Sequence, residues 1–331
     1  MAKKIVVLGD GGWGTALALL LHRNGHSVDL WGNFPEYVDQ MRRRKENVKF
    51  LPGVKLPPDL FLLSGDDIDL NRYDLAVVAV PTQFIRGTIG RLRKDSWRCR
   101  SFLTVAKGIE EKTGRTPSAI LRELTGSSRI AVLSGPSHAE EVARSLPASV
   151  VVASRHEFLA QKIQTLFSCG AFRVYTSHDP LGLELGGALK NVIAIAAGIC
   201  DGLALGDNAK AALLARGVVE MARIGTALGA KKKTFFGLSG IGDLVTTCYS
   251  PHGRNLRVGR EIGRGKSLEA ILGGMEMVAE GVWTTRSIAR LAREKGIDAP
   301  ITGEVYNVLF KGKPPMKAVL HLMTRLPRNE D

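Results

Sequence analysis

The sequence predicts an α/β protein in which a doubly wound, mostly parallel sheet is followed by an all-α region. Short apolar runs alternate with helical patterns through the first half of the chain. These runs are continuously apolar, as expected for strands that helices cover on both faces. After about Asp179 they stop, and only helical patterns follow. We therefore assign residues 1–179 to a Rossmann-type dinucleotide-binding domain and residues 180–331 to an all-helical substrate-binding domain.

The individual elements follow from these patterns in chain order. Apolar runs such as IVVL place strands at 4–9, 27–31, 75–80, 101–106, 130–133, 150–153 and 172–176. Helically spaced apolar residues, as in TALALLLHRNG, place helices between them at 15–24, 83–94, 117–124 and 156–167. Glycines and prolines then divide the second half into helices at 181–198, 208–228, 240–247, 255–263, 267–272, 282–295, 301–310 and 316–324.

The composition indicates a soluble, cytoplasmic globular protein. Its 331 residues are 44% hydrophobic, and MAKKIVVLGDGG enters a short strand without a secretory apolar segment. The four cysteines lie far apart with no CxxC pair, which indicates reduced thiols instead of disulfides or a metal site. The apolar stretch 181–200 contains Glu184, Lys190 and Asn191, which favours a buried helix over membrane insertion.

The formal net charge of +14 raises the question of an anionic partner. The basic residues form scattered runs at 42–45, 86–100 and 231–233, with few aromatic residues between them. We interpret these runs as solvated surface, because no nucleic-acid-binding motif accompanies them.

The stretch GDGGWG places Gly9, Gly11 and Gly14 in the spacing G-x-G-x-x-G, between a strand and a helix. That context favours the dinucleotide fingerprint over a structural glycine turn. Gly9 would allow the tight turn, Gly11 would let a pyrophosphate approach the backbone, and Gly14 would let helix and strand pack closely. The pyrophosphate would then meet free N–H groups at the helix N-terminus.

The end of the second predicted strand bears on the choice of cofactor. An acidic residue about 20 positions after the glycines usually binds the ribose hydroxyls of NAD(H). This position falls near Asn33 and Phe34, neither of which is acidic, and arginines follow at 42–44. The sequence therefore favours NADP(H), and NAD(H) stays open.

Two further segments follow predicted strands, where α/β sheets bind ligands. Lys107 comes directly after strand 101–106, and SGPSHAEEV comes after strand 130–133. Lys107 is either a surface residue or a ligand contact. Ser137 is either a ligand contact or the cap of the next helix, with Glu140 completing a capping box.

The segment 237–255 crowds glycines, threonines and Asp243 beside a helix that begins near Asn255. Arg254 suits a phosphate or a carboxylate, and a helix N-terminus also favours an anion. The segment is therefore either an anion site or a glycine-rich surface loop.

Lys190 stands in the middle of the apolar stretch, and its helical neighbours are Gly186, Gly187, Ile193 and Ala194. Three of these four are glycine or alanine, and they leave space either for a ligand or for close packing of another backbone. A buried ammonium without a partner is costly and tends to lose its proton. Lys190 therefore reaches solvent, has a partner or takes part in chemistry.

Taken together, these segments resemble the bacterial NAD(P)-dependent glycerol-3-phosphate dehydrogenase family over nearly the whole chain. The matching segments, in the family's order, are GDGGWGTALA, VAVPTQ, AKGIE, SGPSHAEEV, ELGGALKNVIAIAAGI, GDNAKAALLARG, GLSGIGDLVTTC, GRN and VAEGVWTT. The resemblance implies reversible reduction of dihydroxyacetone phosphate to sn-glycerol 3-phosphate with NADPH or NADH and no metal. It also implies a cytoplasmic homodimer that supplies glycerophospholipid synthesis.

The resemblance assigns Lys190 as the catalytic proton donor to the developing alkoxide, and as the base in the reverse direction. It places the substrate contacts at Lys107, Gly135, Ser137, Lys190, Asp243, Gly253, Arg254 and Asn255. Asn191 and Thr247 are further candidates for the polar shell. The implied cofactor contacts are Gly9, Gly11, Gly12, Trp13, Gly14, Asn33, Lys107, Ala139, Arg254, Val278 and Glu280.

Three positions depart from the family pattern. Gly12 stands where many relatives carry serine, and Asn33 stands where many carry a basic residue. The loop SPH before Gly253 has no clear counterpart.

Three other functions remain alternatives. A related dehydrogenase acting on a β-hydroxy acid would leave GLSGIGDLVTTC and GRN unexplained. A dinucleotide-sensing regulator would be expected to lack Lys190. A nucleic-acid binder would use the +14 charge and would bind duplexes in a salt-dependent manner.

Overall fold

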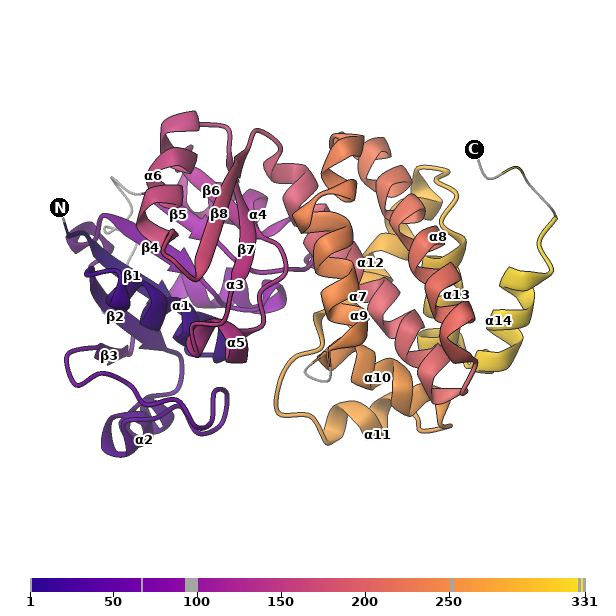
Figure 1. Ribbon diagram of the computed structural model, residues 1–331, viewed down its shortest axis with the longest axis horizontal. Helices are drawn as coiled ribbons and strands as arrows, with labels where there is room; N and C mark the ends of the chain where they lie inside the picture. Colours follow the sequence, from indigo (N-terminus) through magenta and orange to yellow (C-terminus); the bar gives the residue numbers. More distant parts are fainter. Residues whose placement is uncertain (1, 67, 93–100, 251–252, 327–328, 330–331) are drawn as a thin grey trace.

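A computed structural model of the chain, describing residues 2–66, 68–92, 101–250, 253–326 and 329, places an eight-stranded sheet beside a bundle of helices. The sheet is formed by the N-terminal half of the chain and the bundle by the C-terminal half (Figure 1). Strand β8 ends at Ser177, and helix α7 begins at Pro180. The predicted architecture, a mostly parallel sheet followed by helices only, is confirmed.

The sheet has the strand order β3-β2-β1-β4-β5-β6-β7-β8. Its strands are β1 Lys4–Leu8, β2 Ser27–Gly32, β3 Phe61–Ser64, β4 Leu75–Val78, β5 Ser101–Thr104, β6 Ile130–Ser134, β7 Ala148–Ser154 and β8 Phe172–Ser177. All neighbouring strands are parallel except β6 and β7, which are antiparallel. The strand order reverses between β1 and β4, and α/β sheets bind ligands at such a point.

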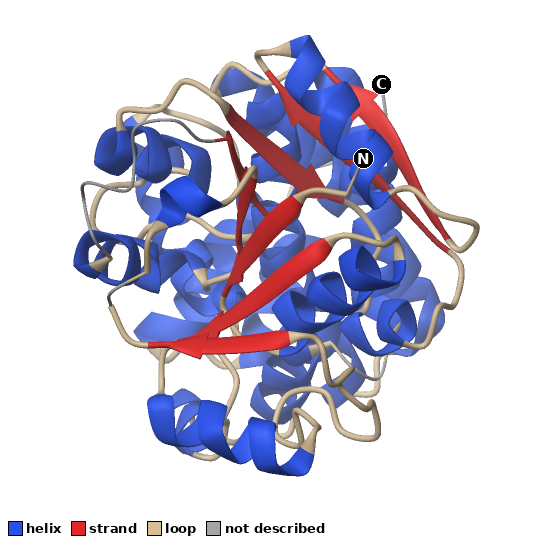
Figure 2. Cartoon of the chain, turned by 90° about the vertical axis from the view of Figure 1, so that its left-hand side faces the viewer, coloured by secondary structure: helices blue, strands red, loops and turns tan. Residues whose placement is uncertain are grey.

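Helices cover both faces of this sheet (Figure 2). They are α1 Gly12–Arg23, α2 Pro35–Arg44, α3 Thr82–Arg91, α4 Pro117–Thr125, α5 Ala139–Ala143 and α6 Glu157–Phe167, with a short 3-10 turn at Leu70–Arg72. Successive residues of a strand point to opposite faces. Ile5 and Val7 accordingly join one apolar cluster, while Val6 and Leu8 join another. Burial on both faces explains why β1 is continuously apolar.

The helical half is arranged around one long helix, α7. Its helices are α7 Pro180–Gly202, α8 Gly206–Ala227, α9 Asp243–Tyr249, α10 Arg254–Gly263, α11 Leu268–Gly273, α12 Glu280–Glu294, α13 Pro300–Lys311 and α14 Pro315–Met323. A 3-10 turn at Lys232–Phe236 and a π-helical turn at Leu238–Gly242 precede α9. Helix α7 is long and apolar enough to span a membrane, but 94% of its most apolar window is buried inside the protein.

Helices α7 and α10 cross at glycines. A Cβ on Gly198 would lie 2.1 Å from the carbonyl oxygen of Leu256, and one on Gly259 would lie 2.0 Å from that of Ile195. Real Cβ contacts essentially never fall below 3.0 Å, so the two backbones could not approach this closely with any other residue at these positions.

The structure adds elements that the sequence patterns did not predict. Strand β3 is short and exposes Phe61, and helix α2 buries only Val38 and Met41. The helix expected after Ser137 is α5, and it has only five residues. The helix predicted at 240–247 begins as the π-helical turn, so α9 starts only at Asp243. The helix predicted at 83–94 ends at Arg91, and residues 93–100 of the basic run, including Cys99, lie outside the described residues, as do two residues of SPH.

Candidate functional site

The glycine turn lies at the carboxyl end of β1, beside the reversal in strand order. Gly9 has a φ of +120°, which favours glycine, and its N–H donates to the carbonyl of Trp31 at 2.9 Å. A Cβ on Gly14 would lie 1.9 Å from the carbonyl oxygen of Gly9, so α1 packs tightly on the turn. A Cβ on Gly11 would meet nothing within 4 Å, which leaves the backbone approachable there. This geometry fits a bound pyrophosphate.

Gly12 and Trp13 open helix α1. A Cβ on Gly12 would lie 2.6 Å from the carbonyl oxygen of Phe50 and 3.6 Å from the Cβ of Ala139. The approach of Phe50 explains physically why no larger residue stands at position 12 in this chain. The indole Nε1 of Trp13 is buried without a hydrogen-bond partner among the described residues, so this donor is available to a ligand.

Two lysine side chains, one from each domain, meet at one carboxylate. Lys190 of α7 donates from Nζ to Asp243 of α9, and to the hydroxyl of Thr247 at 2.7 Å. Lys107, which follows β5, donates to the other carboxylate oxygen of Asp243 at 2.8 Å and to the carbonyl of Gly135 at 3.0 Å. Lys190 therefore has a partner, and the predicted substrate residues on three separate segments lie together.

Burial and neighbouring charges shift the pKa values of this cluster in opposite directions. Lys190 is only 5% exposed, and burial lowers the pKa of its ammonium to about 8, although Asp243 pulls that pKa upward. Burial alone would raise the pKa of Asp243, but the charges of Lys107 and Lys190 hold it below its ordinary value. Asp243 is thus a carboxylate between two amines, and Lys190 can exchange a proton near neutral pH.

The small residues of α7 place Lys190 by letting other segments approach. A Cβ on Gly186 would lie 2.5 Å from the carbonyl oxygen of Ser239, and one on Gly187 would lie 3.0 Å from the hydroxyl of Ser134. Of the two uses foreseen for this face, the structure shows close packing of another backbone at Gly186. Asn191, next to Lys190, donates to the carbonyl of Lys107 at 2.8 Å, which ties the two lysine-bearing segments together.

Helix α10 begins at Arg254 with Gly253 as its N-cap. The Arg254 side chain is exposed, whereas Asn255 is buried. The amide oxygen of Asn255 accepts from the backbone N–H of Gly281 at 3.0 Å, which orients the side chain and leaves its amide nitrogen as a donor for a ligand. A Cβ on Gly253 would lie 2.9 Å from the carbonyl oxygen of Thr247, which brings this N-terminus to the residue that contacts Lys190.

Glu280, predicted to contact the cofactor, joins the two domains. It begins α12, and its carboxylate accepts from the backbone N–H of Thr82 at 2.6 Å and from that of Lys107 at 3.4 Å. Thr82 and Lys107 follow β4 and β5, at the edge of the sheet that carries the glycine turn. Val278 is half-buried in the loop that precedes α12.

Of the two roles left open for Ser137, ligand contact or helix cap with Glu140, the structure does not show the helix cap. The N-cap of α5 is His138 and makes no side-chain capping bond, while Ser137 donates instead to the carbonyl of Gly135 at 2.9 Å. Sequence reasoning also missed His138 itself. Burial, and secondarily the charge of Lys190, lower the pKa of His138, which keeps a neutral imidazole beside the cluster.

Asn33 follows β2 and is half-buried. Its amide oxygen accepts from Arg91 at the end of α3, a contact that the sequence did not indicate. Arg42, from the arginine run, bonds instead to Asp39 and to the carbonyl of Leu62 in β3.

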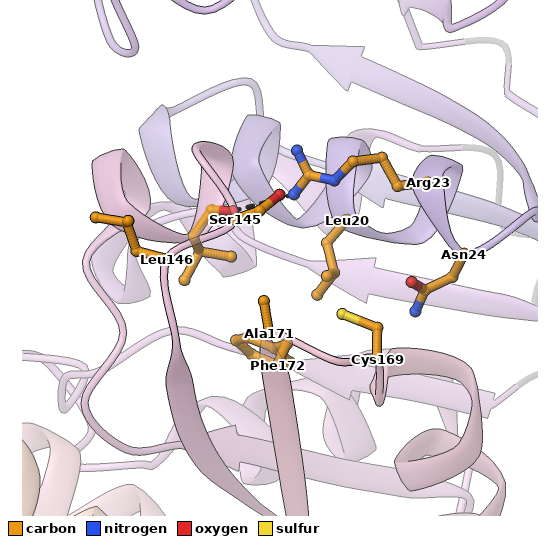
Figure 3. Close-up of a pocket in the computed structure, with 9 residues that line it drawn as sticks. Leu20, Arg23, Asn24, Ser145, Leu146, Cys169, Ala171 and Phe172 are labelled. Atoms are coloured by element: carbon orange, nitrogen blue, oxygen red, sulfur yellow. Dashed lines mark hydrogen bonds between the residues drawn. The ribbon is translucent and has the colours of Figure 1, made fainter.

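Two surface pockets lie away from these residues. One of about 200 Å³ lies between α1 and the start of β8, where Arg23 reaches over towards the loop that contains Ser145 (Figure 3). The other, of about 250 Å³, lies between α12 and α13. Within the described part of the chain, no group of three His, Cys, Asp or Glu residues is arranged to hold a metal ion.

A Rossmann-type sheet with this turn, joined to a helical domain that supplies a buried lysine paired with a carboxylate, defines a two-domain nicotinamide-dependent dehydrogenase. The comparisons with known proteins agree. The family model for the N-terminus of NAD-dependent glycerol-3-phosphate dehydrogenase matches residues 4–160, and that for its C-terminus matches residues 179–320. The chain belongs to this family.

Its relatives match over almost their entire length. A glycerol-3-phosphate dehydrogenase [NAD(P)+] from Chlorobium limicola is 48% identical over 98% of this chain and 99% of its own. One from Geobacillus kaustophilus is 47% identical, with 99% and 96% covered. The crystal structure of glycerol-3-phosphate dehydrogenase from Coxiella burnetii superposes with a TM-score of 0.93 at 35% identity, covering 98% and 99%.

Proposed function

We propose that this chain reduces dihydroxyacetone phosphate reversibly to sn-glycerol 3-phosphate with NADPH or NADH. The observation that carries the proposal is the buried Lys190, bonded to Asp243 and Thr247 at the edge of the dinucleotide-binding sheet. Relatives that bear the name of this activity match the chain from end to end.

When bound, the nicotinamide supplies the hydride. Lys190 gives its proton to the ketone oxygen as negative charge develops there, and neutral Lys190 removes that proton in the reverse direction. A pKa of about 8 leaves both forms of Lys190 populated near neutral pH. Asp243 and Thr247 hold the ammonium in place, and Lys107 adds a second positive charge that stabilises the oxyanion.

The substrate phosphate binds at the N-terminus of α10. Arg254 is exposed there and can pair with two phosphate oxygens, while Asn255 donates from its amide nitrogen. The proposed substrate contacts are Lys107, Gly135, Ser137, Lys190, Asp243, Gly253, Arg254 and Asn255. The proposed cofactor contacts are Gly9, Gly11, Gly12, Trp13, Gly14, Asn33, Lys107, Ala139, Arg254, Val278 and Glu280.

We also propose that the protein is a cytoplasmic homodimer that supplies glycerophospholipid synthesis, divided at 179/180 into its two domains. Support for self-association comes from exposed apolar side chains on α9 and α14, among them Tyr249, Leu320 and Met323.

Product and substrate share the phosphate site, so we expect glycerol 3-phosphate to inhibit the reduction. An initial rate unchanged by product near its own KM would contradict this.

The experiment follows nicotinamide absorbance with purified protein and dihydroxyacetone phosphate, for wild type, Lys190→Ala and Lys210→Ala. Lys210 is a matched control, because it is 7% exposed and bonded at 2.9 Å to a carboxylate, that of Asp201. We expect turnover to fall at least about 100-fold in Lys190→Ala and to stay within a few-fold of wild type in Lys210→Ala. No turnover by a wild-type protein that still binds NADPH would overturn the assignment.

Failure of that assay would favour the alternative, a related dehydrogenase acting on a β-hydroxy acid. D-mandelate dehydrogenase has a TM-score of 0.64 at only 14% identity, so it shows the fold alone, and its named substrate is an α-hydroxy acid, so it lends no support to this alternative. A panel of β-hydroxy acids with NAD⁺ and NADP⁺ would test this alternative directly.

A further inference from the structure

The turn after β2 carries a guanidinium instead of a carboxylate. β2 ends at Gly32, and Asn33 follows it. The side chain of Arg91, the last residue of α3, donates to the amide oxygen of Asn33. The two residues are 58 positions apart, so the fold and not the local sequence brings this charge to the turn.

In a Rossmann domain the adenosine ribose lies beside this turn. A carboxylate there binds the ribose hydroxyls of NAD(H), whereas an arginine accommodates the 2′-phosphate of NADP(H). Asn33 carries no charge. Arg91 is exposed and uses one of its five N–H donors on Asn33, which leaves others to pair with phosphate oxygens.

Arg42, the nearest in sequence of the arginines at 42–44, is directed elsewhere. Arg42 lies in the last turn of α2, a helix of 10 residues that begins at Pro35. Arg42 is the eighth residue of this helix, so its backbone lies about 10 Å along the helix axis from Pro35. Its guanidinium is bonded to Asp39 and to the carbonyl of Leu62.

One carboxylate does approach the same turn. A Cβ on Gly32 would lie 2.6 Å from the Oδ2 atom of Asp10. Asp10 is only 8% exposed, so its carboxyl lies beneath the surface at this turn, whereas the side chain of Arg91 is exposed. The exposed guanidinium of Arg91 therefore outweighs it for a ligand that arrives from solvent.

We propose that Arg91 binds the 2′-phosphate of NADPH, with Asn33 orienting its guanidinium, so that the chain binds NADPH more tightly than NADH. The inference rests on the proposed use of a nicotinamide cofactor, but not on the identity of the ketone. It identifies a specificity-determining residue that lies outside the predicted cofactor contacts.

The test measures the Kd values of NADPH and NADH by titration of nicotinamide fluorescence, without any ketone present. The proteins are wild type, Arg91→Gln and the control Arg42→Gln, which removes a second exposed arginine. We expect Arg91→Gln to raise the Kd of NADPH about 10- to 100-fold, the effect of losing a charge-assisted hydrogen bond, and that of NADH less than about twofold. Arg42→Gln should leave both values near wild type.

Four results would overturn the proposal. They are an unchanged NADPH Kd in Arg91→Gln, an equal loss for both cofactors, a selective loss in Arg42→Gln instead, and tighter binding of NADH than of NADPH by the wild type. As a second variant, Asn33→Asp should weaken NADPH alone, because its carboxylate repels the phosphate and pairs with Arg91. Because no ketone is present, selective loss of NADPH would stand even if dihydroxyacetone phosphate proved not to be the substrate.

Discussion

The carboxylate of Glu184 accepts two hydrogen bonds from Ser118, one from its backbone N–H at 2.6 Å and one from its hydroxyl at 2.7 Å. Glu184 lies on α7 and Ser118 in the first turn of α4, so the helical domain caps a helix of the sheet domain. An acidic group at a helix N-terminus is stabilising, and here it is also fully buried. The contact fixes α7 six residues before Lys190.

The burial of Glu184 predicts a pH-dependent stability, because it outweighs the hydrogen bonds from Ser118, which lower the pKa of this carboxyl. Burial raises the pKa of Glu184 from an ordinary 4.5 to about 7, so the folded protein holds this proton more tightly than the unfolded chain does. The stability that this bound proton gives the folded protein is complete below about pH 4.5 and is lost as the pH rises through about 7. It should lower the free energy of unfolding by about 3 kcal/mol over that range.

Urea denaturation of wild type and Glu184→Gln between pH 4.5 and 8 measures this contribution. The variant cannot titrate at this position, so the difference between the two curves isolates Glu184 from all other groups. Curves that stay parallel across the range would show that Glu184 titrates normally.

The lysine–carboxylate pair predicts opposite pH profiles for the two reaction directions. Reduction needs the ammonium form of Lys190, so its kcat should be constant below about pH 8 and fall above it. Oxidation needs the neutral amine, so its kcat should rise through the same pH. Asp243→Asn removes the charge that raises the pKa of Lys190, which should move both limbs about one pH unit or more lower.

Thr247→Val serves as the control for that shift, since it removes only an uncharged contact to Lys190. Its profile should move less than that of Asp243→Asn. If the pH profiles of kcat in Asp243→Asn stay where those of wild type lie, the titrating group is not Lys190.

The glycine turn predicts a contrast between two alanine substitutions. Gly14→Ala would place a Cβ 1.9 Å from the carbonyl oxygen of Gly9, which should destabilise the fold by about 1–3 kcal/mol. Gly11 has a φ of −62° and open space beside it, so Gly11→Ala should change the unfolding free energy by less than about 0.5 kcal/mol. Its new methyl group would nevertheless stand where the pyrophosphate approaches.

Thermal unfolding and NADPH titration of both variants separate these effects. We expect Gly11→Ala to keep the melting temperature of wild type and to raise the Kd of NADPH at least about tenfold. If Gly11→Ala binds NADPH as tightly as wild type does, the glycine turn does not contact the cofactor at Gly11.

The elements predicted correctly from sequence were those whose pattern can be seen in residues close together in the chain. The residues of β1 alternate between two apolar clusters, so the whole strand is apolar and easily recognised. Strand β3 was not predicted, because it lies at the edge of the sheet, pairs only with β2 and exposes Phe61. Helix α2 was not predicted either, because it is mostly polar and buries only two side chains.

Contacts between distant residues were beyond local patterns. Lys190 meets Asp243 across 53 positions, and Glu184 meets Ser118 across 66. No spacing rule connects such pairs, and the lysine was assigned a role only through the family resemblance. Arg91 lacks even that support, because the resemblance assigns it no role and only the fold brings it to Asn33.

Helix α7 follows the boundary in the sequence, yet it serves both domains. Cutting the chain between residues 179 and 180 would leave the Ser118 donors in one fragment and the Glu184 carboxyl in the other. It would also detach Asp179, whose carboxylate caps α7 by accepting from Gly182 at 3.0 Å. The two halves are therefore complementary fragments and not exchangeable modules, and grafting the helical half onto another dinucleotide-binding sheet would require rebuilding these contacts.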